Sequence, residues 1–332
     1  MLGWRCPTPG SKRPTMLCIL SIALGSSLLY CQVEKRKWNP PRTPEGHPDL
    51  QGIWTNSTLT PLERPSEFRD KPALTEQEAA AYEKRTLEQG NRDRRDGDSE
   101  TDVARAYNEL FFDHGTRLAR IGPSFRTSIV VDPADGRIPQ LTPRAQREAD
   151  EIREYSKQHP ADRAQDRSLT ERCVFWPTAG PPMLPGPYNN TYQIVQTADY
   201  VMILSEMIHD VRIIPLDGRP HLPSGVRKWL GDSRGRWEGE TLVVDTTNLT
   251  GKTRFRGADE NLHVIERFTR IDAETILYRF TIDDPTAFTK SWTGELPFSA
   301  APGPIYEYAC HEGNQALPNI LSGARAREHG SK

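Results

Sequence analysis

The stretch TILYRFTID, residues 275–283, shows most clearly which kind of fold this chain adopts. Every second side chain in it is large and apolar: Ile276, Tyr278, Phe280 and Ile282. Polar side chains, among them Arg279 and Thr281, occupy positions between these. Because successive side chains of a β-strand point to opposite faces, this alternation predicts a strand with one face in a core and the other toward solvent.

The same period of two continues on both sides of this stretch, from Tyr188 to Cys310. It predicts nine strands, near residues 192–197, 200–207, 211–216, 226–230, 242–248, 262–271, 275–283, 288–298 and 305–309. The glycine-rich segment 231–239 is interpreted as a hairpin turn. Links as short as residues 272–274 force neighbouring strands to pair antiparallel, which predicts an antiparallel meander. A barrel or a sandwich would hide the strand edges, and we expect a closed, calycin-like β-barrel.

The N-terminal half of the chain has a different, charged pattern. Thr75 and Glu78 have the spacing of a capping box and predict the start of a helix. Thr142 followed by Pro143 predicts the start of another helix. The expected fold class is therefore mainly β with a helical insertion, an α+β fold.

We divide the chain into four segments on this basis. They are residues 1–31, a signal peptide; residues 32–65, an irregular proline-rich entry that contains a first strand; residues 66–170, a charged helical insertion; and residues 171–332, the antiparallel β-barrel domain. The first strand is expected near Trp54, where Gly52 allows a close approach of the backbone.

The first 31 residues have the pattern of an export signal. Basic residues Arg5, Lys12 and Arg13 precede an uncharged apolar run at residues 16–30, which is short for a membrane span. The sequence therefore predicts an exported protein, periplasmic or extracellular, from which this segment is removed. Two alternatives stay open: lipidation of Cys31, which would attach the protein to a membrane, and retention of the segment as an anchor.

Removal of the signal peptide would leave two cysteines, Cys173 and Cys310. An even number of cysteines in an oxidising compartment is the usual setting for a disulfide. We therefore predict a bridge between these two residues. The alternative is a pair of unrelated buried thiols.

The charge balance bears on the partners of this protein. Lys and Arg number 43 and Asp and Glu 45, which gives a net charge of −2. Such a balance gives no reason to expect nucleic acid or an anionic membrane surface as a partner, so membrane attachment is expected only through a lipid at Cys31. The chain contains no H-E-x-x-H and no C-x-x-C motif. We expect no metal site and no cofactor.

Four of the chain's eight histidines are candidates from the strand-rich half, each with an acidic residue nearby in sequence: His209, His221, His263 and His311. A histidine tuned by a carboxylate is the usual proton-transfer unit near neutral pH. The candidate catalytic residues are His209, His263, Glu266, His311 and Glu312. At least two of the four histidines are expected to face a common cavity, with Glu266 or Glu312 hydrogen-bonded to one of them. The alternatives are structural hydrogen bonds and ion pairs, or a metal site assembled from distant segments.

Aromatic residues bear on the class of ligand. Trp and Tyr fill cores, but they also line sites for sugars and flat organic molecules. The candidate ligand-binding residues are Trp54, Arg212, His221, Trp237, Tyr278 and Trp292. Packing in the core is the alternative use of the aromatic members of this set.

Two resemblances rest on longer stretches of sequence. The segments GHPDLQGIW, DGRPH, GDSRGRWEG and YACHEGN begin at Gly46, Asp217, Gly231 and Tyr308. They are similar to an uncharacterised family of exported bacterial proteins, which implies export but no activity. Gly52-Ile53-Trp54 ahead of a strand meander also resembles the start of lipocalin-type (calycin) β-barrels, which bind small, often apolar molecules. A long helical insertion separates Trp54 from the meander here, whereas lipocalins continue directly.

Three functions are compatible with these patterns. The first is a cofactor-independent lyase, isomerase or hydrolase that uses His and Glu or Asp at the barrel mouth as acid and base. The second is a small-molecule carrier of lipocalin type, and the third is a structural or envelope-interaction protein with a filled barrel. A small molecule of unknown identity is the expected partner in the first two.

Overall fold

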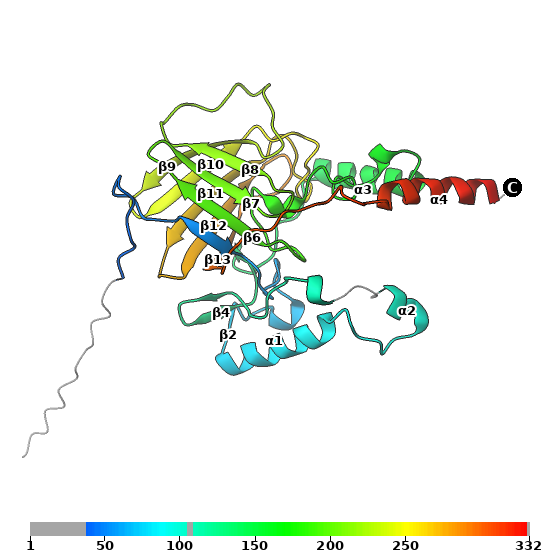
Figure 1. Ribbon diagram of the computed structural model, residues 1–332, viewed down its shortest axis with the longest axis horizontal. Helices are drawn as coiled ribbons and strands as arrows, with labels where there is room; N and C mark the ends of the chain where they lie inside the picture. Colours follow the sequence, from blue (N-terminus) through cyan, green and yellow to red (C-terminus); the bar gives the residue numbers. More distant parts are fainter. Residues whose placement is uncertain (1–37, 105–108, 331–332) are drawn as a thin grey trace, which may run out of the picture. The chain divides into compact units, whose positions relative to one another are not determined.

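The computed structural model describes residues 38–104 and 109–330, and its main feature is one antiparallel sheet (Figure 1). Its strands, in spatial order, are β8 (Val211–Pro215), β7 (Tyr200–Ser205), β6 (Thr191–Gln196), β1 (Gly52–Thr55), β13 (Trp292–Ala300), β12 (Thr275–Asp283), β11 (His263–Arg270), β10 (Thr241–Thr247) and β9 (Asp232–Glu238). The end strands β8 and β9 come close together without a hydrogen-bonded ladder. The sheet is therefore a nearly closed barrel, which confirms the predicted fold class. The predicted signal peptide, with Cys31, lies outside the described residues.

Strand β1 enters this barrel from far away in the sequence. Trp54 pairs with Tyr192 of β6 on one side and with Ala300 of β13 on the other. Without β1, strands β6 and β13 would both present open edges. The first strand predicted near Trp54 is thus part of the barrel wall.

The interior of the barrel is filled with side chains. The largest fully buried ones include Trp292, Tyr192, Tyr278, Phe268, Phe280 and Phe298. They come from alternate positions of their strands, as the pattern of residues 275–283 predicts. The ring centroids of Tyr278 and Phe298 lie 4.9 Å apart across neighbouring strands. The core is therefore packed rather than hollow.

Gly235 on β9 allows the close approach of β8 to β9. A Cβ atom at this position would lie 2.7 Å from Leu216 and 2.8 Å from Ile214. Any larger residue would push the two end strands apart. We call the line where β8 and β9 meet without a ladder the seam.

Three predictions for individual segments were wrong. Residues 226–230 and 305–309 do not form strands. The glycine-rich segment 231–239, interpreted as a hairpin turn, instead forms β9. The turn comes after it: Gly239, with φ of 59°, and Glu240 connect β9 to β10. The error arose because Gly235 serves close packing of strands, whereas the sequence pattern was interpreted as flexibility.

The insertion before β6 carries most of the helices. They are α1 (Glu76–Gly90), α2 (Ser99–Ala104) and α3 (Pro143–Gln158), with short 3-10 helices at Ser66–Phe68, Glu109–Phe111, Ala164–Asp166 and Pro177–Ala179. The capping box of Thr75 and Glu78 at the start of α1 is confirmed, and so is the Thr142 cap before Pro143. No helix among the described residues is long and apolar enough to cross a membrane.

A small second sheet packs against α1. Its strands are β2 (Ala73–Leu74), β4 (Ser124–Arg126) and β3 (Arg120–Ile121), and its side chains form a separate core with Leu59, Leu74, Ala79, Leu118 and Phe125. Strand β5 (Val130–Asp132) leaves the insertion and pairs with β13 of the barrel. The insertion is thus joined to the barrel by backbone pairing.

The predicted disulfide between Cys173 and Cys310 is confirmed, with Cα atoms 5.8 Å apart. It links the loop before β6 to the tail that continues from β13. After the bridge the chain forms α4 (Ala316–Gly330). Structural disulfides persist in oxidising compartments, so this bridge suggests an environment other than the reducing cytoplasm.

Candidate functional site

One ion pair interrupts the apolar packing inside the barrel. Arg212 on β8 donates from Nη1 to Glu266 Oε1 on β11 at 3.0 Å, and their side chains are 3% and 0% exposed. Tyr278 Oη donates to the same carboxylate oxygen at 2.8 Å and accepts the Met183 N–H at 2.9 Å. Burial acts to lower the pKa of Arg212, but the facing carboxylate outweighs it and raises this pKa. Arg212 therefore stays charged inside the core beside Glu266, where loss of either partner would be costly.

The expectation was that Glu266 or Glu312 bonds a histidine, and this arrangement corrects it for Glu266. Its carboxylate is engaged by Arg212 and Tyr278 instead, because a guanidinium matches a buried carboxylate with two parallel N–H donors. His311 and Glu312 are exposed on the tail after β13. The candidate catalytic residues therefore do not meet at one place.

His209 lies in the turn between β7 and β8. Its backbone has a positive φ of 62° and its N–H donates to the Glu206 carbonyl at 3.2 Å. It joins none of the other three histidines selected from the sequence.

Two of those histidines do come together, on the outer face of the barrel. Asp245 Oδ1 lies 3.0 Å from His221 Nε2 and 3.0 Å from His263 Nε2. The other nitrogen of His221, Nδ1, lies 3.2 Å from Asp232 Oδ2. We call Asp232, His221, Asp245 and His263 the histidine–aspartate chain. The carboxylate that binds them is Asp245, which the sequence analysis did not select.

The hydrogen bond between His263 and Asp245 shifts the pKa of both side chains. It raises the pKa of His263 and lowers the pKa of Asp245, while burial opposes each shift. Both shifts favour the ion pair of a protonated His263 with a charged Asp245. Among the described residues, no group of three or more His, Cys, Asp or Glu side chains is arranged to hold a metal ion.

The aromatic residues selected as ligand contacts lie mostly in the core. Trp54 and Trp292 are buried, and Trp54 Nε1 donates to the Leu50 carbonyl at 2.9 Å. Trp237 stacks on His47 with ring centroids 4.8 Å apart. The buried members, Trp54 and Trp292, therefore serve the core and do not line a ligand site.

One sequence signal was missed. Residues 231–235, GDSRG, match the G-x-S-x-G pattern of serine hydrolases, in which the serine sits on a sharp turn between a strand and a helix. Here Ser233 lies inside β9 and its Oγ is 2.9 Å from Thr246 Oγ1. It also accepts a hydrogen bond from Arg212 at 3.3 Å. Without the strand–turn–helix geometry, the match does not define a nucleophile.

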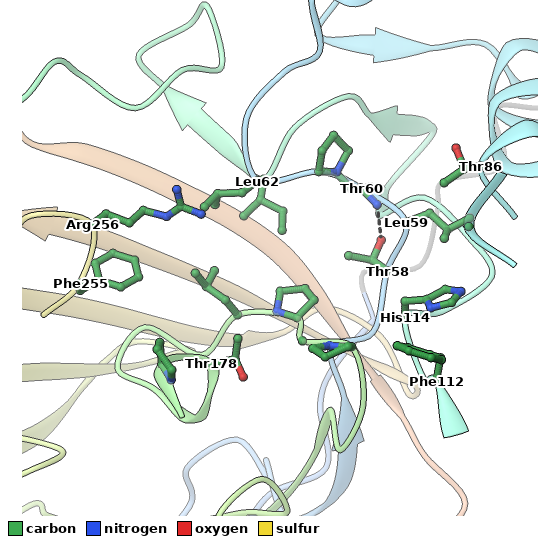
Figure 2. A pocket seen from close by; sticks show the side chains of 18 of the residues that line it. Thr58, Leu59, Thr60, Leu62, Thr86, Phe112, His114, Thr178, Phe255 and Arg256 are labelled. Carbon is green, nitrogen blue, oxygen red and sulfur yellow. Dashed lines mark hydrogen bonds between the residues drawn. The ribbon is translucent and has the colours of Figure 1, made fainter. Parts of the chain in front are cut away.

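The best candidate for a ligand site is a cavity of about 670 Å³ (Figure 2). It lies where the segment after β1, the loop before β6 and the loop between β10 and β11 meet. Its apolar lining includes Leu59, Leu62, Ile129, Leu184 and Phe255. Its basic lining residues are Arg92, His114, Arg254 and Arg256, and none of the described residues that line it is acidic. We call this cavity the cationic pocket.

Arg256 occupies a strained position at the rim of the cationic pocket. Phe255 and Ala258 exchange two backbone hydrogen bonds of 2.9 Å around a two-residue turn in which Arg256 has φ of 52° and Gly257 has φ of 101°. Such turns favour Asn or Gly at both positions, because a side chain is disfavoured at positive φ. Strained residues of this kind cluster at functional sites, so an arginine here points to a role for its side chain.

The hairpin that carries Arg256 is anchored by its apolar residue. Phe255 is buried and its ring stacks near Trp292 with centroids 6.1 Å apart. Arg254 and Arg256, on either side of it, are exposed. Neither arginine forms a salt bridge with any residue in the described part of the chain. Arg254 helps to lower the pKa of Glu148, so its charge is partly offset, but its guanidinium donors are not held in a salt bridge with any described residue.

The opposite side of the cationic pocket is formed by the insertion. The Arg92 guanidinium lies over the Phe112 ring, 5.4 Å from its centroid. His114 Nε2 is 3.4 Å from Glu109 Oε1, which draws the imidazole toward a carboxylate outside the pocket lining. Positive charge thus approaches the cavity from the barrel loops and from the insertion.

Comparisons with protein-family models, with curated proteins and with solved structures find no match to this chain.

The residues of the cationic pocket were not selected from the sequence. Its basic residues come from segments around positions 92, 114 and 254–256, which no local motif connects. The one available signal was Phe255-Arg256-Gly257-Ala258 between two predicted strands, since Gly in such a short link indicates a tight turn. Arginine is an unusual residue before the glycine of such a tight turn, so its presence indicates a candidate functional position.

Proposed function

We propose that this is an exported small-molecule-binding protein, and that it holds an organic anion with an apolar body in the cationic pocket. The observation that carries the proposal is a concave, largely apolar cavity whose charged lining residues are all basic. The ligand sits at the edge of the packed barrel, not inside it.

The apolar wall supports the apolar part of the ligand. Leu59, Leu62, Leu184 and Phe255 present side chains to a cavity within the size range of small-molecule sites, about 300–1,000 Å³. Figure 2 shows Leu62 and Phe255 on one side of this cavity and Phe112 on the other. Burial of apolar surface contributes about 25 cal/mol per Å², so a ring system or a short alkyl chain would gain several kcal/mol here.

The arginines support the anionic part. Arg254 and Arg256 present planar guanidinium groups that match carboxylate, sulfonate or phosphate oxygens with paired N–H donors. The unpaired charges of a concave site with apolar walls also attract anions over several ångströms. A carboxylate on a hydrophobic body fits both features.

Export is part of this proposal and is supported by two features. The basic residues before the apolar run at positions 16–30 have the pattern of a signal peptide. The disulfide between Cys173 and Cys310 is of a kind that persists outside the reducing cytoplasm. N-terminal sequencing of the mature protein should begin near residues 26–32, and a soluble cytoplasmic product that starts at Met1 would contradict export.

The binding proposal is tested with 2-naphthoate and its neutral amide, measured by isothermal titration calorimetry. The variant Arg254→Gln/Arg256→Gln should weaken 2-naphthoate binding at least tenfold, about 1.4 kcal/mol. Lys252→Gln is the matched control, because Lys252 is an exposed cation of the same loop that does not line the pocket. Equal affinity for the acid and the amide, or unchanged binding in the double variant, would refute the proposal.

A second candidate function is proton transfer at the histidine–aspartate chain. This function is the acid–base enzyme of the sequence analysis, with Asp245 and His263 as the acid–base residues in place of Glu266 and His311. The test is turnover of a panel of esters, lactones and hydroxy acids. Activity lost in His263→Gln but kept in His311→Gln would support this function, whereas activity that survives His263→Gln would exclude it.

A further inference from the structure

A second cavity, of about 710 Å³, lies on the other side of the segment that carries Phe112. Its carboxylate residues are Asp113, Glu206 and Glu307, and its lining also includes Tyr188, Tyr306 and Tyr308. None of the described residues that line it is Lys, Arg or His. We call this cavity the acidic pocket. It is separate from the cationic pocket, so a ligand of the acidic pocket is independent of anion binding in the cationic pocket.

Glu206 is a nearly buried carboxylate of the acidic pocket. It is 6% exposed, and Asn189 Nδ2 donates to its Oε1 at 2.9 Å. Within the described part of the chain no Lys, Arg or His forms a salt bridge with it. A buried carboxylate is strongly disfavoured unless a cation or several hydrogen bonds compensate it. The pocket therefore favours a positively charged group beside Glu206.

Asp113 is a second carboxylic acid of the acidic pocket, and it interacts electrostatically with Glu206. Burial raises the pKa of Asp113, hydrogen bonds from Asn190 and Ser57 oppose the rise, and the charge of Glu206 adds to it. The two carboxyl groups are thus close enough to repel each other in their charged forms. A cation placed between them would remove that repulsion.

The aromatic lining selects the kind of cation. Tyr306, which is 67% exposed, offers a ring face, and Tyr188, Tyr308, Phe111 and Phe112 line the same cavity. Ring faces attract alkylated ammonium groups, which keep little of the hydration shell that a bare metal ion retains. We propose that the acidic pocket binds an organic cation, an alkylated ammonium group on a small apolar body, with Glu206 as its counter-ion.

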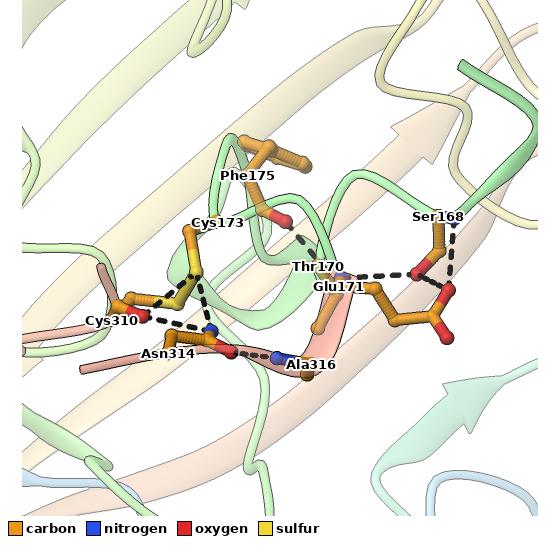
Figure 3. Close-up of a disulfide and its surroundings, with 8 residues drawn as sticks. All are labelled: Ser168, Thr170, Glu171, Cys173, Phe175, Cys310, Asn314 and Ala316. Carbon is orange, nitrogen blue, oxygen red and sulfur yellow. Dashed lines mark hydrogen bonds between the residues drawn. A yellow bond between two sulfur atoms is a disulfide. The ribbon is translucent and has the colours of Figure 1, made fainter. Parts of the chain in front are cut away.

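The disulfide holds one wall of this site. Residues 301–310 supply Tyr306, Glu307 and Tyr308, and Cys310 at their end is bonded to Cys173 (Figure 3). Asn314 Nδ2 donates to the Cys310 carbonyl at 2.9 Å, which fixes the tail just beyond the bridge. Since this tail contains no strand, the bridge is the covalent constraint that keeps its aromatic residues at the pocket.

The test uses the full-length mature protein with benzyltrimethylammonium as the probe and neopentylbenzene as its neutral isostere. Binding is measured by saturation-transfer NMR and calorimetry. Glu206→Gln keeps the shape and the bond from Asn189, and it should weaken binding of the cation at least tenfold. Glu312→Gln is the matched control, because Glu312 is an exposed acid of the same tail outside the pocket lining.

Tyr306→Leu provides an independent variant, because Tyr306 is largely exposed and its loss should leave folding intact. It should weaken binding of the cation about threefold, since one ring face is lost. Thermal unfolding reports whether each variant is folded. Equal binding of the cation and its neutral isostere, or wild-type affinity in both variants, would overturn the proposal.

Discussion

The cationic pocket and the acidic pocket lie back to back, yet their lining residues carry opposite charge. Phe112 lines both, and the neighbouring residues Asp113 and His114 line one each. The Asp113 N–H donates to the Pro187 carbonyl at 2.8 Å, so two backbone segments form the partition between them. Each pocket is completed by a further wall, formed by a loop that does not line the other pocket. The charged residues of that loop contribute to the charge of its pocket.

The completing loops differ in both charge and attachment. The cationic pocket is completed by the hairpin of Arg254 and Arg256, which joins two barrel strands and is anchored by Phe255. The acidic pocket is completed by a tail that a disulfide holds. A net charge of −2 therefore conceals two local sites of opposite sign. Net charge gives no reason to expect partners with extended charge, such as nucleic acid, and it says nothing about small ligands.

The largest expected effect comes from a change inside the barrel, which supports both pockets. Glu266→Gln leaves the buried guanidinium of Arg212 without its counter-ion and should lower the free energy of unfolding by about 3–5 kcal/mol. Urea denaturation measures this loss. The variant Arg212→Met/Glu266→Met removes both charges and should lose less than the single variant. A single variant within about 1 kcal/mol of wild type would show that the pair does not support the barrel.

The next effect should separate the two pockets. Cys173→Ser/Cys310→Ser frees the tail and should lower the free energy of unfolding by about 2–4 kcal/mol. Binding of benzyltrimethylammonium should be lost, while binding of 2-naphthoate should stay within about twofold of wild type. Dithiothreitol should reproduce this result in the wild type and change nothing in the variant. Loss of both ligands would contradict the separation.

A smaller effect should appear at the rim of the cationic pocket, with opposite signs for stability and binding. Arg256→Asn relieves the positive φ of 52° and should raise the free energy of unfolding by about 0.5–1 kcal/mol. The same change removes a guanidinium and should weaken 2-naphthoate binding several-fold. Chemical denaturation and calorimetry measure the two effects. A variant that is less stable than wild type and binds 2-naphthoate with wild-type affinity would contradict the assigned role of Arg256.

The smallest effect concerns a charge pair that belongs to neither pocket. The folded protein raises the pKa of His263 above the ordinary value of 6.5. Its contribution to stability is therefore complete below pH about 6.5 and declines as the pH rises through the raised pKa. Relative to His263→Gln, the wild type should lose less than about 1 kcal/mol between pH 6 and pH 8.5, because the pair is partly exposed. A constant difference across this range would contradict the pairing with Asp245.

Local patterns predicted the parts of the fold that local physics determines. The alternation at residues 275–283 predicted β12 with the observed bounds. Thr75 and Glu78 predicted the start of α1, because a capping box needs no distant partner. The bridge of Cys173 to Cys310 was predictable because these are the two of the five cysteines that lie outside the predicted signal peptide. In each case the deciding residues were adjacent or chemically restricted in their partners.

Features that depend on tertiary packing were missed or misassigned. Gly235 has the same sequence signature as a turn glycine, yet it lies inside β9, where its small size admits Ile214 and Leu216. The place of β1 between β6 and β13 depends on which edge remained open, and no residue near Trp54 indicates that. The strand predictions were right where a strand has one clear buried face.

The candidate sites show the same limit more strongly. Two histidines were expected to face a common cavity, but His221 and His263 meet on the outer face of the barrel, and their shared partner Asp245 lies on a different strand from Glu266. The basic residues of the cationic pocket come from separate segments whose charges are unremarkable one at a time. Only the barrel and the insertion together place Arg92, Arg254 and Arg256 around one cavity. Sequence spacing contains no information on that arrangement.

The seam also determines where the barrel opens during thermal fluctuation. Strands β8 and β9 are each paired along one edge, whereas β12 is paired along both. Ile213 of β8 is 62% exposed and Ile214 is buried, so apolar burial protects only one face of that strand. Local opening should therefore start at the seam, and the amides of β8 should exchange with deuterium sooner than those of β12. Arg212, which belongs to β8, would then reach solvent in the same excursion, so that the buried charge pair is hydrated long before the protein unfolds as a whole.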